Sequence, residues 1–272
     1  MFRTFLITNN SQRLADSPIR DIGNQIQAIM DDKDGDYKTA SHPTIFHELL
    51  NSDLLSPEEK SLPRLAEEGE TVVGAGANTT AHMLKLTSFH LLANPVILQK
   101  LKAELASATP NPGSPIPLRQ LEQLPYLTGV VNEGLRMSYG VSSRLPRVSP
   151  DSPLIFKQWK IPPGTPVSMT SVLLHENPAY FPEPSVFRPE RWLEGNSPDK
   201  RLERYLVPFS KGTRACAGMN LAYAEIYLAL AAVFGRLEME LWETTRDDVD
   251  VVHDFFNPSA KLDSKGVRVI VK

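Results

Sequence analysis

The single cysteine of the chain is the feature that most constrains its fold. Cys216 lies in the decapeptide Phe209-Ser-Lys-Gly-Thr-Arg-Ala-Cys-Ala-Gly218, and no second cysteine is present to form a disulfide. A nearby cation and backbone amides at a helix start both stabilise a thiolate, and glycines let a backbone approach a flat ligand closely. The decapeptide therefore indicates a loop that presents one thiolate to an electron-poor partner. The alternative is an ordinary free cysteine buried as a small hydrophobe.

The segment after the loop supports the first interpretation. We expect a helix over residues 219–237, with Gly218 at its start, so that the unpaired amides of the first turn face the sulfur. Arg214 can supply the cation. Gly212 and Gly218 provide the tight turns that residues with a Cβ atom resist.

The decapeptide resembles the haem-binding loop of the cytochrome P-450 family, F-x-x-G-x-R-x-C-x-G, and matches it at every fixed position. In that family the cysteine thiolate is the axial ligand of the haem iron. The resemblance implies that Cys216 binds the iron of haem b. It also places Phe209, Gly212, Arg214 and Gly218 around the cofactor.

A second motif lies in a long predicted helix, at Gly74-Ala-Gly-Ala-Asn-Thr-Thr80. Each glycine inside a helix costs about 1 kcal/mol relative to alanine. Either close approach of a large flat ligand or close packing against another helix can compensate. A dinucleotide-binding loop does not fit, because Thr79 occupies the position of the third glycine and no strand precedes the motif.

This stretch resembles the oxygen-activation motif of the same family, A-G-x-[D/E]-T. The resemblance implies that Ala75 and Gly76 border the haem and that Thr79 assists proton delivery. Asn78 departs from the pattern, because the family usually has an acid there and an amide cannot carry a proton as a carboxylate does. The proton relay would then run through Thr79 and water. Asn78 also leaves open a haem-thiolate isomerase or dehydratase that needs no O₂.

Two further elements occur in family order. Glu133-x-x-Arg136 places opposite charges on one helix face, and Pro189-Glu-Arg-Trp192 follows it. Alone, such a pair is usually a solvated surface pair. By resemblance, Glu133, Arg136 and Arg191 form a buried ion network. It holds the meander, which is the irregular segment that contains Pro189–Trp192, and through it the cysteine loop. Removal of one member would destabilise the chain strongly.

The segment between these elements suggests additional site residues. By resemblance, Arg147 binds a haem propionate together with Arg214, a task that suits arginine; otherwise Arg147 is an ordinary surface residue. Val141, Ser142 and Ser143 would border the substrate pocket. The histidines show no metal-ligand spacing, so we assign them no chemistry.

Composition excludes several classes of protein. The chain has 272 residues, of which 41% are hydrophobic and 22% are charged, with a net charge of −3. This is an ordinary globular composition with enough apolar residues for a sizeable core. It provides no basic stripe for nucleic acid, and no apolar run approaches the roughly 18 residues of a membrane span.

The fold class that we expect is mainly α with a small β-sheet. It corresponds to the C-terminal portion of the cytochrome P-450 fold: long central helix, E-x-x-R helix, meander, cysteine loop and following helix. Ser56-Pro-Glu-Glu59 reads as a helix start, and Pro163-Gly164 as a type II turn. We expect helices over 21–30, 45–50, 62–92, 96–106, 118–123 and 127–137, and strands over 154–156, 159–161, 167–170, 237–241 and 267–271.

The resemblance covers about residues 56–272, with residues 1–55 as a helical lead-in. Members of the family are generally much longer, and their cysteine comes far later. We therefore expect this chain to be truncated, without the N-terminal half and without the membrane anchor that typically holds the family at the endoplasmic reticulum. Apolar surface on the long helix and on residues 127–137 would then lack cover.

The local sequence of several stretches, such as Pro162-Pro-Gly-Thr-Pro-Val, is most similar to that of fungal members, which often oxidise terpenoids and other secondary metabolites. The resemblance implies a haem-thiolate monooxygenase that inserts one oxygen atom from O₂ into a small hydrophobic substrate. Electrons would come from an NADPH-dependent cytochrome P-450 reductase, docked at Lys200, Arg201, Arg204 and Lys211. The alternative is a non-catalytic remnant that does not bind haem alone. The sequence leaves the substrate and the regiochemistry open.

Overall fold

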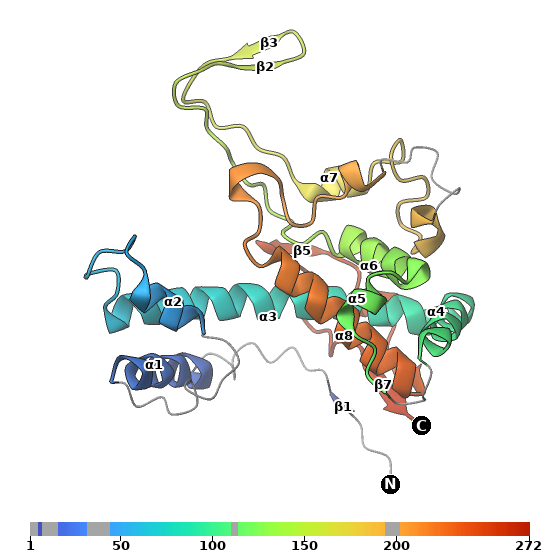
Figure 1. Ribbon diagram of the computed structural model, residues 1–272. Helices are drawn as coiled ribbons and strands as arrows, with labels where there is room; N and C mark the ends of the chain where they lie inside the picture. The colour runs from blue at the N-terminus through green and yellow to red at the C-terminus, as the bar shows by residue number, and fades with distance from the viewer. Residues whose placement is uncertain (1–4, 7–15, 32–43, 110–113, 194–201) are drawn as a thin grey trace. The chain divides into compact units, whose positions relative to one another are not determined.

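The computed structural model describes residues 5–6, 16–31, 44–109, 114–193 and 202–272 (Figure 1). The chain divides into two compact units, one of residues 8–78 and one of residues 1–7 and 79–272. Most of the described backbone is helical. The α-helices are α1 (Asp16–Met30), α2 (Ile45–Asn51), α3 (Leu62–Ala93), α4 (Pro95–Ala108), α5 (Leu118–Leu121), α6 (Pro125–Ser138), α7 (Ser171–His175) and α8 (Met219–Arg236).

The unit of residues 8–78 has a small core of its own. Ile22 and Ile26 of α1 and Leu65 of α3 are buried in it. Gly69 allows this packing, because a Cβ atom there would lie 2.6 Å from Cγ2 of Ile22 and 2.8 Å from Phe46. Beyond this core, residues 70–78 of α3 are exposed on every face.

The helix start expected at Ser56 is wrong. Residues 57–60 form a turn, in which the amide of Lys60 donates to the carbonyl of Pro57 at 3.2 Å, and α3 begins at Leu62. The reason is Pro63, which is tolerated only in the first turn of a helix because it lacks an N–H and its ring clashes with the carbonyl four residues earlier.

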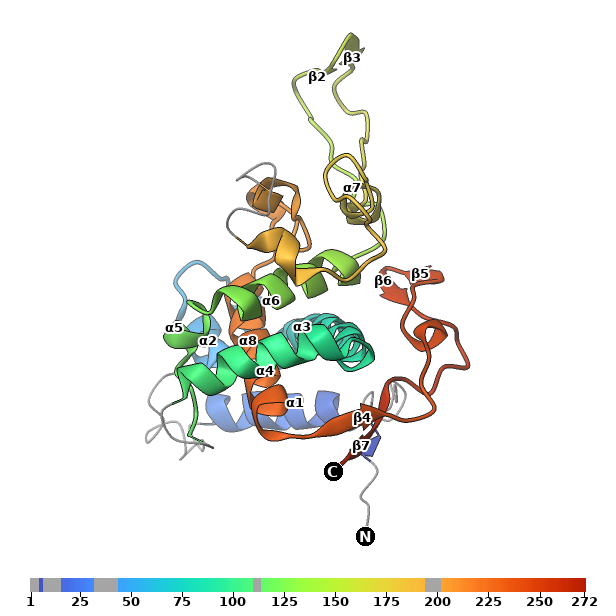
Figure 2. The same cartoon turned by 90° about the vertical axis from the view of Figure 1, so that its right-hand side faces the viewer.

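The core of the larger unit lies between α4, α6 and α8 (Figure 2). Helix α6 is its centre, with Leu127, Val130 and Val131 at 0% exposure. The expected uncovered surface on residues 127–137 is therefore wrong, since neighbouring helices cover it. Gly129 allows close approach to the meander, because a Cβ atom there would lie 2.8 Å from the carbonyl oxygen of Pro189.

The described strands form three small antiparallel sheets. β1 (Phe5–Leu6), β7 (Arg268–Val271) and β4 (Met239–Leu241) pair in that order, with Met239 opposite Val271. β2 (Leu154–Phe156) pairs with β3 (Trp159–Ile161) in a hairpin that stands apart from the helices (Figures 1 and 2). β5 (His253–Phe255) pairs with β6 (Asn257–Ser259). The sequence analysis missed β1, β5 and β6, which are too short to show a periodic pattern.

The strand expected over residues 167–170 is reduced to a single bridge between Val167 and Arg147. Thr170 instead caps α7, accepting a hydrogen bond from the amide of Val172 at 3.3 Å. The predicted turn at Pro163-Gly164 is confirmed: Gly164 has φ +76°, and the amide of Thr165 donates to Pro162 at 3.3 Å.

Four short 3₁₀ turns occur among the described residues that follow α7. These are η2 (Pro189–Trp192), η3 (Leu202–Tyr205), η4 (Gly212–Arg214) and η5 (Arg246–Asp248). Across the residues that the structure describes, no helix combines the length and the apolar character needed to cross a membrane.

Candidate functional site

The cysteine loop is closed by backbone hydrogen bonds. The amide of Cys216 donates to the carbonyl of Phe209 at 2.9 Å, and the amide of Ala215 donates to that of Gly212 at 3.0 Å. Gly212 has φ +78°, a conformation that glycine adopts at no steric cost. The thiol of Cys216 is exposed. The loop therefore holds an accessible thiol in a defined place rather than burying it.

Helix α8 begins three residues after the cysteine. Gly218 is its N-cap residue, and no side chain caps the first turn. A Cβ atom on Gly218 would lie 3.9 Å from Sγ of Cys216, so the sulfur sits close beside the helix start. The positive end of an 18-residue helix dipole favours an anionic ligand at this point.

Phe209 anchors the other end of the loop. Its ring is half-buried and lies 5.2 Å from that of Tyr223 in α8. The next aromatic residue of the helix, Tyr227, donates its hydroxyl to Thr128 of α6 at 3.0 Å. The loop is thus fixed to the helical core on its Phe209 side and stays open on its Cys216 side.

Among the described residues, Arg147 and Arg214 form no ion pair with an acidic side chain. Arg147 donates only to the carbonyls of Leu145 and Pro146, at 3.3 and 3.1 Å, while two backbone bonds with Val167 hold its main chain. Arg214 is exposed and forms no ion pair within the described parts of the chain. Both guanidinium groups can therefore receive an external carboxylate.

The glycines of the long helix do not serve packing in this structure. A Cβ atom on Gly74 or Gly76 would meet no atom within 4 Å. Ala75 and Asn78 are exposed, and Thr79 is half-buried. Of the two explanations for these glycines, helix–helix packing lacks a partner among the described residues.

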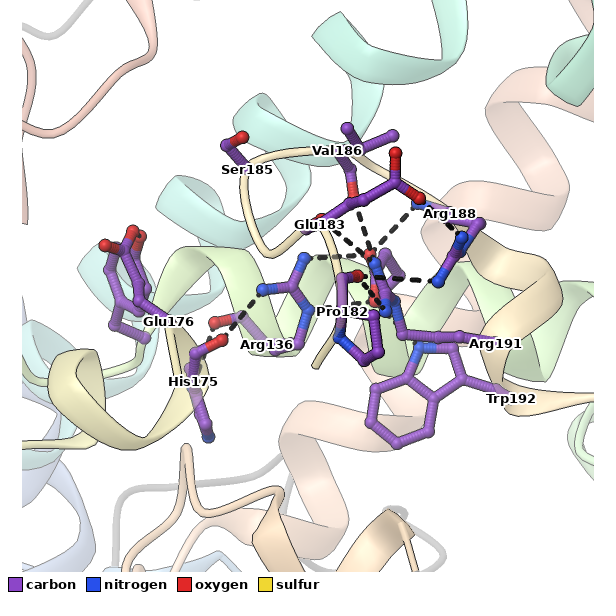
Figure 3. A network of polar contacts seen from close by, with 12 residues as sticks. Arg136, His175, Glu176, Pro182, Glu183, Ser185, Val186, Arg188, Arg191 and Trp192 are labelled. Carbon is purple, nitrogen blue, oxygen red and sulfur yellow. Dashed lines mark hydrogen bonds and ion pairs between the residues drawn. The ribbon is translucent and has the colours of Figure 1, made fainter. Parts of the chain in front are cut away.

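Glu133 is the centre of a buried ion network, and Figure 3 labels its partners Arg136, Arg188, Arg191 and Trp192. Its carboxylate, at 0% exposure, accepts two hydrogen bonds from Arg136 at 2.8 and 3.0 Å and one from Arg191 at 3.0 Å. The indole of Trp192 and the amide of Arg188 donate to the same group at 2.9 and 3.0 Å. The carboxylate is therefore fully paired, as burial of a charge requires.

The network fastens the meander to α6. Arg191 also donates to the carbonyls of Pro182, Glu183 and Val186, at 3.0 to 3.3 Å (Figure 3). Burial lowers the pKa of Arg191, and the charge of Glu133 opposes this effect. One arginine therefore joins the segment before η2 to the helix that carries Glu133.

The cytochrome P-450 family model matches residues 1–263 of the chain. The chain belongs to the cytochrome P-450 family. Its cysteine loop and Glu133 network are the parts of the structure that carry the family's motifs.

Similar curated proteins include fungal cytochrome P-450 enzymes. A monooxygenase of Ascocoryne sarcoides is 50% identical over 84% of this chain and 45% of its own length. A tryptophan 6-hydroxylase of Fusarium equiseti is 46% identical over 91% of this chain and 48% of its own length. An N-acetyltryptophan 6-hydroxylase of Emericella nidulans is 47% identical over 90% of this chain and 48% of its own length. The chain spans about half the length of the curated relatives it matches.

The predicted pocket border in this cytochrome P-450 chain is tied to the β5–β6 hairpin. Ser142 and Ser143 donate to Oδ1 of Asp254 at 2.8 and 2.7 Å, and the amide of Ser142 donates to Phe256 at 3.1 Å. These hydroxyls lower the pKa of Asp254. Sequence reasoning missed Asp254, because an isolated aspartate far along the chain carries no local signal. Val141 is half-buried, and its carbonyl accepts a hydrogen bond from Ser171 at 3.0 Å.

His175 is a second residue that sequence reasoning missed. It is fully buried, and burial lowers its pKa to about 4. Its carbonyl accepts a hydrogen bond from Arg136 at 3.0 Å (Figure 3). The sequence around the short helix α7 does not predict this contact, because only the fold brings His175 beside α6.

The basic residues expected to dock a reductase are partly described. Arg204 and Lys211 are exposed, and Nζ of Lys211 donates to the carbonyl of Arg204 at 2.7 Å. Lys200 and Arg201 lie outside the described residues. Among the residues that are described, no cluster of histidine, cysteine and acidic side chains could hold a metal ion by itself.

Proposed function

We propose that this chain provides the haem-binding part, residues 56–272, of a haem-thiolate monooxygenase. The observation that carries the proposal is the exposed thiol of Cys216, held at the uncapped start of α8 by its 2.9 Å backbone bond to Phe209. A free thiol of this kind is a ligand for a soft or borderline metal centre. Within the described residues no other cysteine is present to form a disulfide with it.

The donor set fits haem b. Cys216 would bind the iron, and Phe209, Gly212 and Gly218 would shape the loop against the ring. Arg147 and Arg214, which pair with no acidic side chain in the described parts of the chain, would bind the propionates. The surface at Ala75 and Gly76, where no neighbouring atom would meet a Cβ at position 76, leaves room for a flat ligand.

When bound, a thiolate-ligated haem supplies the reductive activation of O₂. In the proposed reaction one oxygen atom would enter a C–H bond of the substrate and the other would leave as water, at the cost of two electrons and two protons. Thr79 would hold a water molecule and pass it protons through its hydroxyl group. Asn78 can orient that water but cannot itself deliver a proton.

The substrate would be a small hydrophobic fungal metabolite, for example a terpenoid. Two relatives are named for hydroxylation of tryptophan and of N-acetyltryptophan, so indoles are a second class to test. Val141, Ser142 and Ser143, held by Asp254, would border the pocket. An NADPH-dependent reductase would supply the electrons at the side of Arg204 and Lys211.

The test is the difference spectrum of the reduced, carbon-monoxide-bound protein, recorded after expression with a haem precursor. A red-shifted Soret band that is lost in Cys216→Ser supports the proposal. A blue-shifted band in the parent chain would show that haem binds without the thiolate. Absence of haem would favour the non-catalytic alternative for this chain.

A haem-thiolate isomerase or dehydratase is a second candidate, and Asn78 is the observation that favours it. Such an enzyme needs neither O₂ nor a reductase. Measurement of O₂ and NADPH consumption with reductase and substrate present separates the two functions. Asn78→Asp should raise the coupling of NADPH oxidation to product in a monooxygenase and leave an isomerase unaffected.

A further inference from the structure

The imidazole of His175 bridges two segments that are far apart in the chain. Its Nδ1 lies 2.9 Å from the carbonyl oxygen of Arg136, and the amide of Val207 lies 2.9 Å from its Nε2. A carbonyl can only accept a hydrogen bond and an amide N–H can only donate one. Both contacts are therefore satisfied in a single protonation state, the neutral ring with its proton on Nδ1.

We propose that His175 is a positioning residue that sets the cysteine loop against the Glu133 network. This inference rests on the proposed function only where it concerns the thiolate. One end of the ring holds the last turn of α6, which carries Arg136. The other end holds Val207, at the entry to the loop.

The entry to the loop leads directly to the sulfur. Val207 lies two residues before Phe209, and the carbonyl of Phe209 accepts the amide hydrogen bond of Cys216 at 2.9 Å. A movement of Val207 therefore moves the group that fixes the cysteine. A second contact joins the same segments, because a Cβ atom on Gly140, just after α6, would lie 3.1 Å from the carbonyl carbon of Pro208.

The surroundings of His175 prevent the ring from turning. It is at 0% exposure, with the ring of Tyr139 at 6.4 Å and that of Phe181 edge-on at 6.1 Å. Ser171 fixes the start of α7 by donating to the carbonyls of Tyr139 and Val141, at 2.8 and 3.0 Å. The packing thus holds the ring in the orientation that both backbone contacts require.

Three variants of the full chain test the proposal. His175→Phe keeps a ring of similar size but removes both hydrogen bonds, whereas His175→Gln offers one donor and one acceptor on a side-chain amide. Leu101→Ala is the control, because it removes buried volume from α4, which takes part in neither hydrogen bond of the His175 ring. A merely structural role predicts that His175→Phe behaves like Leu101→Ala.

The first readout is hydrogen exchange without haem, measured on peptides that cover residues 206–217. We expect about tenfold faster exchange in His175→Phe, as loss of one amide hydrogen bond implies, with α4 unchanged and with recovery in His175→Gln. Unchanged exchange in this segment, or a uniform rise as in the control, would overturn the proposal. If His175→Phe does not fold, nitrogen NMR of the parent chain decides: a proton on Nε2 of His175 contradicts it.

The second readout is the reduced carbon-monoxide spectrum of the haem-loaded chain. We expect the blue-shifted fraction to increase several-fold in His175→Phe and to return toward the parent value in His175→Gln. A parent chain without any red-shifted band would refute the proposed function. The exchange and NMR results would still decide the role of His175.

Discussion

The guanidinium of Arg136 lies 2.8 Å from the carboxylate of Glu133, and solvent reaches 1% or less of either side chain. This pair joins α6 to two other segments of the larger unit. The same carboxylate binds Arg191 of the meander, while the carbonyl of Arg136 receives the ring of His175. A single turn of α6 thus binds two segments that precede the cysteine loop, the meander and α7.

Loss of the central carboxylate should be severe. Glu133→Gln leaves the two buried guanidinium groups without an anion, so we expect a decrease of about 3–5 kcal/mol in the free energy of unfolding. Urea denaturation followed by circular dichroism measures it. Glu183→Gln, at an exposed pair with Arg188, is the matched control and should cost less than 1 kcal/mol. Equal effects of the two substitutions would contradict the role of the network.

Glycine-to-alanine substitutions should have opposite signs at two positions. At Gly134 a Cβ atom would overlap Thr87 and lie 2.6 Å from Met83, so we expect about 1–3 kcal/mol of destabilisation. At Gly76 it would meet nothing, so Gly76→Ala should stabilise the haem-free chain by up to about 1 kcal/mol. Thermal denaturation of both variants checks this.

Gly76→Ala also tests the proposed haem contact. If the ring lies against this part of α3, the added methyl group should weaken haem binding even though it stabilises the helix. Haem titration of Gly76→Ala and of the parent chain gives the comparison. Equal affinities would remove Gly76 from the proposed cofactor site.

Acid should destabilise the protein through three of its histidines. Burial lowers the pKa values of His82, His90 and His175 from 6.5 to about 4. The unfolded chain then binds protons that the folded chain excludes, so this contribution is complete above pH 6.5 and is lost as the pH falls toward 4. At about 1.4 kcal/mol per unit of pKa shift, the titration of His175 alone lowers the free energy of unfolding by about 3 kcal/mol.

Denaturation curves between pH 7.5 and 4.5 measure this effect. The parent chain should lose stability more steeply than His175→Gln, by a slope equivalent to about one proton. Parallel profiles for the two proteins would show that His175 does not titrate in this range.

Substitution of the cysteine should separate folding from cofactor binding. Cys216 is exposed, so Cys216→Ser should change the free energy of unfolding by no more than about 0.5 kcal/mol. The red-shifted band should nevertheless disappear. A large loss of stability in the haem-free variant would mean that the thiol has a packing role that the loop geometry does not show.

The sequence by itself determined the elements whose signals are local. Amphipathic periodicity and proline placed α4, α6 and α8 within a few residues of their actual bounds, and Gly164 marked its turn. The decapeptide around Cys216 identified the family, because its residue types serve one purpose within ten positions, the presentation of a stabilised thiolate. The separate helix start expected at Ser56 was wrong, because Pro63 permits a helix only from Leu62 onward, which is where the predicted 62–92 helix begins.

Only the tertiary structure decided which distant residues share a contact. His175 carries no motif, and its role appears only when α7 brings it between Arg136 and Val207. Asp254 likewise contacts the proposed pocket border because the β5–β6 hairpin returns to Ser142. Such contacts depend on burial and direction, which are properties of the folded chain, so local sequence patterns do not contain them.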